Sequence, residues 1–255
     1  MKGILGEASK NSFVVLKGDS KWLNLNYSKR KKIIKETCEK YNTDGFIVLF
    51  PKDEKNFIWD FYNKDGSSAE FCGNGARLSV IAAKNFGLIK EDEGSLWTLA
   101  GEVPYEILKE NLVKIQIPKV SDIALLDEKY YYVNTGVPHI VIFVEEDDFD
   151  EVVDKYMKDL APKLREKYNS NVNFVKILDK NKIKVRTYER GVGETLACGS
   201  GSVASALVSH YIKNLDKDIL VVPKAGEKEA LKVEIGEKVF LEGNANILKD
   251  LEINY

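Results

Sequence analysis

The sequence predicts an α+β fold in which two pseudo-symmetric domains arose by internal duplication. Short apolar runs that alternate with polar residues dominate the chain, and fewer helical segments interrupt them, which favours mixed or antiparallel sheets. The pattern Cys-Gly-x-Gly occurs at Cys72 and again at Cys198, separated by close to half of the 255 residues. The same order of expected elements surrounds both copies. Repetition at half the chain length indicates two copies of one unit that face each other.

Alternating apolar positions and polar caps define the elements of the first half. The first strand precedes a helix that Ser28 caps, because a serine before a helical apolar pattern accepts hydrogen bonds from the free amides of the first turn. Two strands joined by a polar turn then lead to a glycine-punctuated loop and to the helix that opens at Cys72. The expected ranges are strand 12–16, helix 28–41, strands 46–50 and 56–62, loop 63–68, a helix from 72, and strands 95–99, 102–108 and 112–117.

The second half repeats this order. Two strands precede a helical region, two more strands lead to a loop, and a helix opens at Cys198 before three final strands. The expected ranges are strands 131–133 and 140–144, helix 149–167, strands 172–177 and 182–188, a helix from 198, and strands 218–222, 229–234 and 238–242. We therefore expect one domain over 1–118 and a second over 119–245.

Composition excludes several classes of function. With 38 basic and 40 acidic residues the formal charge is −2, which provides no electrostatic footprint for nucleic acid. No apolar stretch approaches the roughly 20 residues of a membrane span, and charged residues appear too early for a secretory signal. Three cysteines are too few for a disulfide scaffold. We expect a soluble cytoplasmic protein with free thiols that binds neither nucleic acid nor membrane.

The two matched cysteines stand where their helices begin. Glycine at the second and fourth positions lets the backbone tighten and exposes amide N–H groups at the helix start. A cysteine there experiences the positive end of the helix dipole, which lowers its pKa from about 8.5 and raises the thiolate fraction. The same N–H groups form a site for an anion such as a carboxylate. Each half therefore provides a base or nucleophile beside a carboxylate cradle.

Two such units facing each other would bring two thiols to opposite sides of one bound carboxylate. One thiolate removes the proton of the α-carbon, the other thiol returns a proton on the opposite face, and the stereocentre inverts. The helix N–H groups stabilise the charge that builds on the carboxylate. Contacts of about 3–3.5 Å would set the sulfurs roughly 6–7 Å apart. His139 and His210 form no ligand pattern with the cysteines, so we expect no metal.

Long stretches around both cysteines resemble one known family. Residues 61–77, FYNKDGSSAEFCGNGAR, closely resemble the first signature of diaminopimelate epimerases, and residues 189–201, ERGVGETLACGSG, resemble the second. Residues 136–139 and 171–175 match further stretches of that family in the right order. Proline racemases share the Cys-Gly-x-Gly pattern, but the continuation Asn-Gly-Ala-Arg favours the diaminopimelate branch.

The resemblance implies a mixed or antiparallel sheet wrapped around a central helix in each domain, with a last strand over 246–255 returning to the first domain. It implies a cofactor-independent isomerase, a homodimer that interconverts LL- and meso-diaminopimelate in lysine and peptidoglycan precursor synthesis. Cys72 and Cys198 would be the acid–base pair. The residues that match substrate-binding positions of the family are Asn11, Asn63, Gly73, Asn74, Asn171, Glu189, Arg190, Gly199 and Ser200. Arg190 suits a distal carboxylate and Glu189 an ammonium group.

Two segments depart from the family pattern. The N-terminal Gly-Asn-Asp-Phe segment is present only as residues 10–13, Lys-Asn-Ser-Phe, in which Asn11 is kept. The usual asparagine before Pro-His is Val137, and an apolar side chain cannot replace the hydrogen bonds of an amide. Either a water molecule or a neighbour such as Asn134 compensates, or the substrate differs from diaminopimelate.

Other functions therefore stay open at this point. A racemase of the same architecture for another amino acid, for example a basic one, would account for Val137. A redox protein could switch Cys72 and Cys198 between dithiol and disulfide, because low-pKa thiols that face each other oxidise readily. A non-catalytic amino-acid-binding module is less favoured, since binding alone requires neither thiol.

Overall fold

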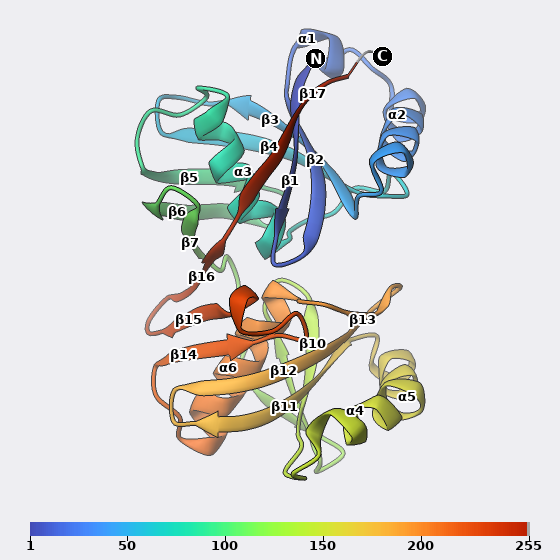
Figure 1. Ribbon diagram of the computed structural model, residues 1–255, viewed down its shortest axis with the longest axis vertical. Helices are drawn as coiled ribbons and strands as arrows, with labels where there is room; N and C mark the ends of the chain where they lie inside the picture. The colour runs from blue at the N-terminus through green and yellow to red at the C-terminus, as the bar shows by residue number, and fades with distance from the viewer. Residues whose placement is uncertain (254–255) are drawn as a thin grey trace. The chain divides into compact units, whose positions relative to one another are not determined.

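The computed structural model describes residues 1–253 and separates the chain into two compact units (Figure 1). Unit 1 comprises Met1–Gln116 together with the chain from Gly243 onward, and unit 2 comprises Ile117–Glu242. Each unit combines one large sheet with a few helices. Within the described residues no helix has the length and apolarity that crossing a membrane requires.

Unit 1 contains a sheet with strand order β17-β1-β2-β3-β4-β5-β6-β7. The β2–β3 and β4–β5 pairs are parallel, and the other pairs are antiparallel. Its elements are β1 (Lys2–Ala8), β2 (Asn11–Lys17), α1 (Ser20–Leu23), α2 (Tyr27–Tyr41), β3 (Gly45–Pro51), β4 (Asn56–Asn63), α3 (Gly73–Asn85), β5 (Glu93–Thr98), β6 (Gly101–Lys109), β7 (Leu112–Gln116) and β17 (Asn246–Glu252).

Unit 2 contains a sheet with strand order β8-β9-β10-β11-β12-β14-β15-β16, and β13 also pairs with β12. Here β10–β11 and β12–β14 are the parallel pairs. Its elements are β8 (Ala124–Leu126), β9 (Tyr130–Asn134), β10 (Pro138–Phe143), α4 (Phe149–Lys158), α5 (Leu160–Tyr168), β11 (Asn171–Asp179), β12 (Lys182–Glu189), β13 (Gly193–Thr195), α6 (Gly199–Lys213), β14 (Asp218–Val222), the 3-10 helix η1 (Glu227–Glu229), β15 (Leu231–Ile235) and β16 (Val239–Asn244).

The two units share one topology, which confirms the predicted fold class. Strands β1 to β7 correspond in order to β9, β10, β11, β12, β14, β15 and β16, and the parallel pairs fall at the same two places. Helix α3 packs against β1, β2, β3, β6, β7 and β17, and helix α6 packs against β9, β10, β11, β12, β14 and β15. Each sheet therefore wraps around one central helix, and both helices are buried on nearly every side near their N-terminal ends, as core helices are.

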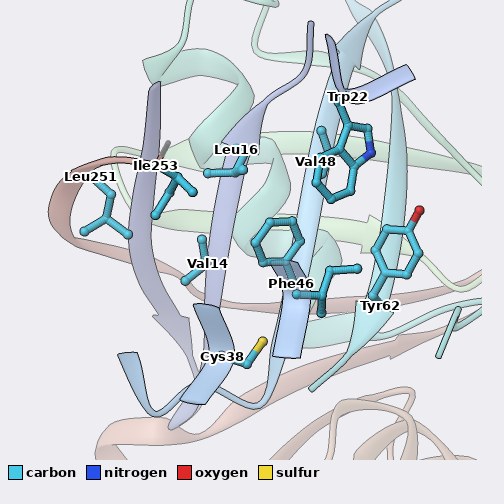
Figure 2. Close-up of a cluster of buried hydrophobic side chains, with 10 residues drawn as sticks. Val14, Leu16, Trp22, Cys38, Phe46, Val48, Tyr62, Leu251 and Ile253 are labelled. Atoms are coloured by element: carbon cyan, nitrogen blue, oxygen red, sulfur yellow. The ribbon is translucent and has the colours of Figure 1, made fainter. Parts of the chain in front are cut away.

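A cluster of apolar side chains fills the space between α1, α2 and the sheet of unit 1 (Figure 2). Trp22 stacks on Phe46, with ring centroids 5.5 Å apart. Cys38 of α2 belongs to this cluster and is 3% exposed, so the third cysteine is a core residue. In unit 2 a second cluster joins α4 and α5 to β10 and β11. These clusters fix the outer helices, while α3 and α6 occupy the interior of their sheets.

Several boundaries differ from those the sequence predicts. Helix α2 is capped by Asn26 rather than Ser28, because the Asn26 side chain accepts a hydrogen bond of 2.9 Å from the Lys29 amide. The single helix expected over 149–167 is two helices, α4 and α5. Pro162 causes the break, since a proline ring excludes the helical position of the carbonyl four residues earlier, that of Lys158.

The sequence analysis did not predict five elements, which are short or contain glycine. They are β1, α1, β8, β13 and η1. Gly3 and Gly6 obscure the alternation of β1, and both are sites of close packing: a Cβ atom on Gly6 would lie 2.6 Å from Leu78 of α3. Such glycines mark close approach of a neighbouring element to a strand. Of the strand expected over 246–255, residues 254 and 255 lie outside the described part.

Candidate active site

In unit 1, Cys72 is the N-cap of α3. It lies at the end of the loop that follows β4, in an extended conformation (φ −149°, ψ 117°). Its sulfur accepts a hydrogen bond from the Gly75 amide, with N to Sγ at 3.5 Å. Serine and aspartate oxygens usually occupy such a cap position. Here a sulfur takes it, so the helix dipole and an amide N–H both favour a thiolate at this atom.

Asn11 lies beside the sulfur of Cys72. It follows the tight turn between β1 and β2, where Ser9 and Lys10 both have positive φ. Its Oδ1 atom is 3.8 Å from Cys72 Sγ, within reach of the thiol proton. Its Nδ2 atom donates to Asp44 Oδ2 at 2.8 Å, and this carboxylate also accepts the Ser12 amide. Asp44 therefore holds the amide of Asn11 with its oxygen toward the thiol.

In unit 2, Cys198 is the N-cap of α6 and has almost the same geometry. Its backbone is extended (φ −131°, ψ 113°), and its sulfur accepts from the Gly201 amide at 3.4 Å. The Ser200 hydroxyl lies 3.5 Å from the same sulfur. The duplication therefore repeats the cap itself, with sulfur as the cap atom in both units.

A chain of buried polar groups leads to Cys198 from the sheet. Asn173 Oδ1 accepts from the Thr187 hydroxyl at 2.9 Å, so its Nδ2 faces the His139 ring and donates to Nδ1 at 3.0 Å. The proton of the neutral ring must then be on Nε2, which lies 2.9 Å from Ser200 Oγ. Ser200 accepts that bond, and its Oγ atom lies 3.5 Å from Cys198 Sγ, a contact in which either atom can be the donor. The chain thus reaches the sulfur, and a thiolate there can accept the Ser200 hydroxyl proton.

His139 is fully buried, and desolvation lowers its pKa to about 3. The hydrogen bond from Asn173 and the charge of Arg190 are smaller influences. The ring is therefore neutral at physiological pH. It can orient Ser200, but it holds no proton that it could release as an acid near neutrality.

The buried His139 should make unit 2 sensitive to acid. An unfolded histidine has a pKa near 6.5, so below that pH the unfolded chain binds a proton that the folded chain excludes. This stabilising contribution is complete above pH 6.5 and is lost progressively as the pH falls toward 3. Between pH 6.5 and 5 we expect a loss of about 2 kcal/mol in the free energy of unfolding. Denaturant titrations at both pH values should show this loss in the wild type and not in His139→Gln; equal losses would contradict the assignment.

The residues predicted to bind the distal end of a substrate gather where β11 begins and β12 ends. Asn171, which is 7% exposed, accepts the Arg190 amide through Oδ1 at 2.8 Å. Glu189 accepts from the Thr195 hydroxyl at 2.6 Å. The guanidinium of Arg190 reaches the Asn169 carbonyl at 3.4 Å and is exposed. The structure therefore brings Asn171, Glu189 and Arg190 together.

A buried arginine anchors this loop to the rest of unit 2. Arg186 is 3% exposed and pairs with Asp154 of α4 at 2.5 Å and with Glu194 of β13 at 2.7 Å. Burial by itself would raise the pKa of Glu194, but hydrogen bonds from Arg186 and Lys224 hold it below its usual value. Through Arg186 of β12, the ion pairs tie β13, which leads directly to Cys198, to helix α4.

The remaining predicted residues lie at the two helix starts and in one loop. Gly73 and Asn74 open α3, Gly199 and Ser200 open α6, and all but Ser200 are buried. Amides of a first helical turn have no partner within the helix, so both starts keep the carboxylate-binding character that the sequence predicts. Asn63, at the end of β4, donates to the Ser67 hydroxyl at 3.0 Å and is exposed.

Val137 lies in the turn between β9 and β10. Asn134, a neighbour that could compensate for it, uses its Oδ1 atom to accept the Gly136 amide at 3.0 Å. The oxygen of this side chain therefore holds the turn. Among the described residues, no group of three or more His, Cys, Asp or Glu side chains is arranged to hold a metal ion.

We call the residues that surround Cys72 and those that surround Cys198 the two half-sites. Sequence analysis did not identify Asp44, Asn173 or Thr187 as parts of them. For Asn173 a signal was present, because alternation along β11 puts it on the same face as Asn171. Its partner Thr187 is opposite it in the β11–β12 register. Asp44 is 33 positions from Asn11 in the sequence, and only the parallel pairing of β2 with β3 brings the two together.

Comparisons with known proteins identify the family of this chain. The family model described as diaminopimelate epimerase matches residues 5–121 and 131–248. A diaminopimelate epimerase of Campylobacter jejuni (strain 81-176) is 37% identical, with 97% of both chains covered. One from Nitratiruptor sp. is 38% identical, with 92% of both chains covered.

Solved structures with low sequence identity show the same fold. A predicted epimerase from Pseudomonas aeruginosa aligns with a TM-score of 0.71 at 14% identity, covering 99% of this chain and 98% of that one. A probable proline racemase from Agrobacterium radiobacter, with bound carbonate, aligns with a TM-score of 0.71 at 12% identity and covers 99% and 92%.

Proposed function

Because this chain belongs to the diaminopimelate epimerase family and is an isomerase, we propose that its substrate pair is LL- and meso-diaminopimelate. The reaction would serve lysine and peptidoglycan precursor synthesis. The observation that carries the proposal is the repeated sulfur cap: each unit begins its central helix with a cysteine whose sulfur accepts an amide N–H. A core cysteine requires no such cap, and a proton-transferring thiolate benefits from it.

In the proposed reaction one of the two thiolates removes the α-proton and the other thiol returns one to the opposite face. The bond from the α-carbon to hydrogen breaks as the sulfur–hydrogen bond forms, and the electron pair is left on the α-carbon and its carboxylate. In the reverse direction the two sulfurs exchange roles, so both are needed in each turnover. No cofactor takes part in this scheme.

The carbanion is the difficult intermediate, because the α-proton of an amino acid is a weak acid. The free amides at Gly73 and Asn74, and those at Gly199 and Ser200, are the groups we assign to the reacting carboxylate. Charge grows on that carboxylate as the proton leaves, so preorganised N–H donors stabilise the transition state more than the ground state.

Because His139 is neutral, we can assign which groups donate hydrogen bonds near Cys198. Ser200 receives the Nε2 proton of His139 as a hydrogen bond, and in this proposal its own hydroxyl proton is donated to the Cys198 sulfur 3.5 Å away. This donation stabilises the thiolate, while the ring keeps its proton throughout. At Cys72 the corresponding neighbour is Asn11, whose Oδ1 accepts from a thiol and so favours the protonated form. This contrast favours Cys198 as the resting thiolate and Cys72 as the resting thiol.

The distal amino-acid group would bind at Asn63, Asn171, Glu189 and Arg190. Arg190 offers a planar guanidinium for the carboxylate, and Glu189 offers an acceptor for the ammonium group. Asn11 we assign to the reacting end, beside Cys72. A substrate without a second charged head group would leave Glu189 and Arg190 without ligands, which opposes small neutral amino acids.

One observation favours a second candidate, a racemase for a different amino acid. Val137 replaces the family's amide, and the oxygen of Asn134 is engaged in its own turn. If no other group restores the missing hydrogen bond, a substrate that lacks the corresponding polar group would bind better.

Hydrogen–deuterium exchange distinguishes these functions. We expect the reduced protein, incubated in D₂O with LL-diaminopimelate, to form the meso isomer with deuterium at one α-carbon, as NMR and mass spectrometry detect. Parallel incubations with lysine, arginine, ornithine and proline serve as controls and should show no exchange. Exchange with one of these and not with diaminopimelate would establish the second candidate. Absence of exchange with all of them would refute both and leave a redox or binding function.

A further inference from the structure

Arg77 lies on helix α3 and is completely buried. Its guanidinium donates hydrogen bonds to groups at the start of its own helix and just before Asn11. Nη2 donates to Asn74 Oδ1 at 2.9 Å and to Ser9 Oγ at 3.1 Å, and Nη1 donates to the Gly73 carbonyl at 3.3 Å. Burying a guanidinium is costly unless its donors are used. The groups that accept its hydrogen bonds therefore indicate what Arg77 does.

The bond to Asn74 fixes the orientation of a side-chain amide. Arg77 provides only donors, so the atom of Asn74 that faces it must be the oxygen. The Nδ2 group of Asn74, on the other branch of the planar amide, is then directed away from the guanidinium and stays a donor. Asn74 itself is 3% exposed and is the second residue of α3. Arg77 therefore turns Asn74 into a fixed hydrogen-bond donor at a helix start.

The bond to Ser9 reaches a different segment of the same half-site. Ser9 is 4% exposed and has a φ of 51° in the turn between β1 and β2. Two residues later, Asn11 approaches the sulfur of Cys72. Arg77 thus joins the turn that carries Asn11 to the helix start that carries Asn74, and Cys72 lies between these segments in contact with both.

In unit 2 a different residue holds the side chain at the position equivalent to Asn74. By alignment of the two caps, Asn74 corresponds to Ser200 and Arg77 to Val203, which is fully buried. No guanidinium occupies that place in α6, and Ser200 is instead held by the buried His139. In each unit, a nitrogen of a buried side chain therefore donates a hydrogen bond to the side-chain oxygen of the helix's second residue, which is Asn74 in α3 and Ser200 in α6.

We propose that Arg77 is a positioning residue of the epimerase reaction, which orients Asn74 toward the reacting carboxylate as His139 orients Ser200. This inference rests on the proposed function. Arg77 touches neither substrate nor sulfur in this scheme, so its effect on the reaction must pass through Asn74.

A double-mutant cycle tests this route. We expect Arg77→Met and Asn74→Ala each to lower kcat/KM about 10- to 100-fold, mainly through kcat, because the carboxylate charge that Asn74 faces grows in the transition state. If Arg77 acts through Asn74, adding Arg77→Met to Asn74→Ala should lower kcat/KM by less than about 3-fold more. Losses that multiply would overturn the proposal. Arg77→Lys replaces Arg77→Met if the latter does not fold, and should behave similarly because one ammonium cannot span all three acceptors.

A second readout does not depend on turnover. Iodoacetate carries a carboxylate and iodoacetamide does not, so the ratio of their alkylation rates at Cys72 reports the carboxylate cradle. We expect this ratio to fall about 3- to 10-fold in Arg77→Met and in Asn74→Ala. The matched control is Leu78→Ala, which removes buried packing from the next position of α3 and should leave the ratio unchanged. An unchanged ratio in Arg77→Met refutes the inference, whereas failure of the wild type to exchange diaminopimelate refutes only the proposed function.

Discussion

Alanine at either Cys72 or Cys198 should lower the rate of epimerisation at least about 10³-fold, because each turnover needs one sulfur as base and the other as acid. Two caps of matched geometry predict equal dependence on both thiols. Cys38→Ala is the matched control, since Cys38 belongs to the core cluster of α2 and should leave the rate per folded molecule unchanged. The rate of meso-diaminopimelate formation from the LL isomer measures all three variants.

The single variants should also differ in which isomer they exchange. With one sulfur removed, the remaining thiolate can still take and return a proton on its own face, so deuterium enters without inversion. We expect Cys72→Ala and Cys198→Ala to exchange opposite isomers, as resolved by NMR of the recovered substrate. Exchange of the same isomer by both, or near wild-type epimerisation by either, would rule out the two-base scheme.

Alanine at Gly201 should lower the free energy of unfolding by about 3 kcal/mol, whereas alanine at Gly75 should change it by less than about 1 kcal/mol. A Cβ atom on Gly201 would lie 2.5 Å from Asn173 Oδ1 and 3.1 Å from the Thr187 hydroxyl, so it would break the buried polar chain. For a Cβ atom on Gly75 the nearest atom would be Ile47 Cδ1 at 3.3 Å, and alanine has a higher helix propensity than glycine.

Denaturant unfolding of both variants measures this difference, and Gly75→Ala is a control at the equivalent position of the duplicated helix. A small effect of Gly201→Ala would mean that Asn173 and Thr187 can move apart without loss. Comparable losses in the two variants would show that glycine is required by the cap itself rather than by the polar chain.

The sequence indicates the two helix starts well, because their signals are local. The pattern Cys-Gly-x-Gly before an apolar helical pattern identifies Cys72 and Cys198. In the structure, α3 and α6 begin one residue after these cysteines. The duplication is visible for the same reason. Local signals are weaker where two caps compete: Asn26 and Ser28 both suit an N-cap, and the structure uses Asn26.

Contacts between distant segments could not be predicted in this way. Arg77 reads as an ordinary helical residue until the turn at Ser9 is folded against it, and Asp44 becomes part of the half-site only through the β2–β3 pairing. The polar chain through Asn173, His139 and Ser200 likewise spans three elements. These groups are set by topology, whereas periodicity and capping report only neighbours along the chain.

The return of β17 to β1 has a consequence for biosynthesis. Unit 2 is contained in one continuous stretch, but the sheet of unit 1 gains an outer strand only when residues 246–252 pair with residues 2–7. During translation, the N-terminal segment must therefore wait until residues 246–252 have left the ribosome. The usual order, in which the N-terminal domain matures first, is reversed here, and a chain that stalls before residue 246 is made would present an open sheet edge to chaperones.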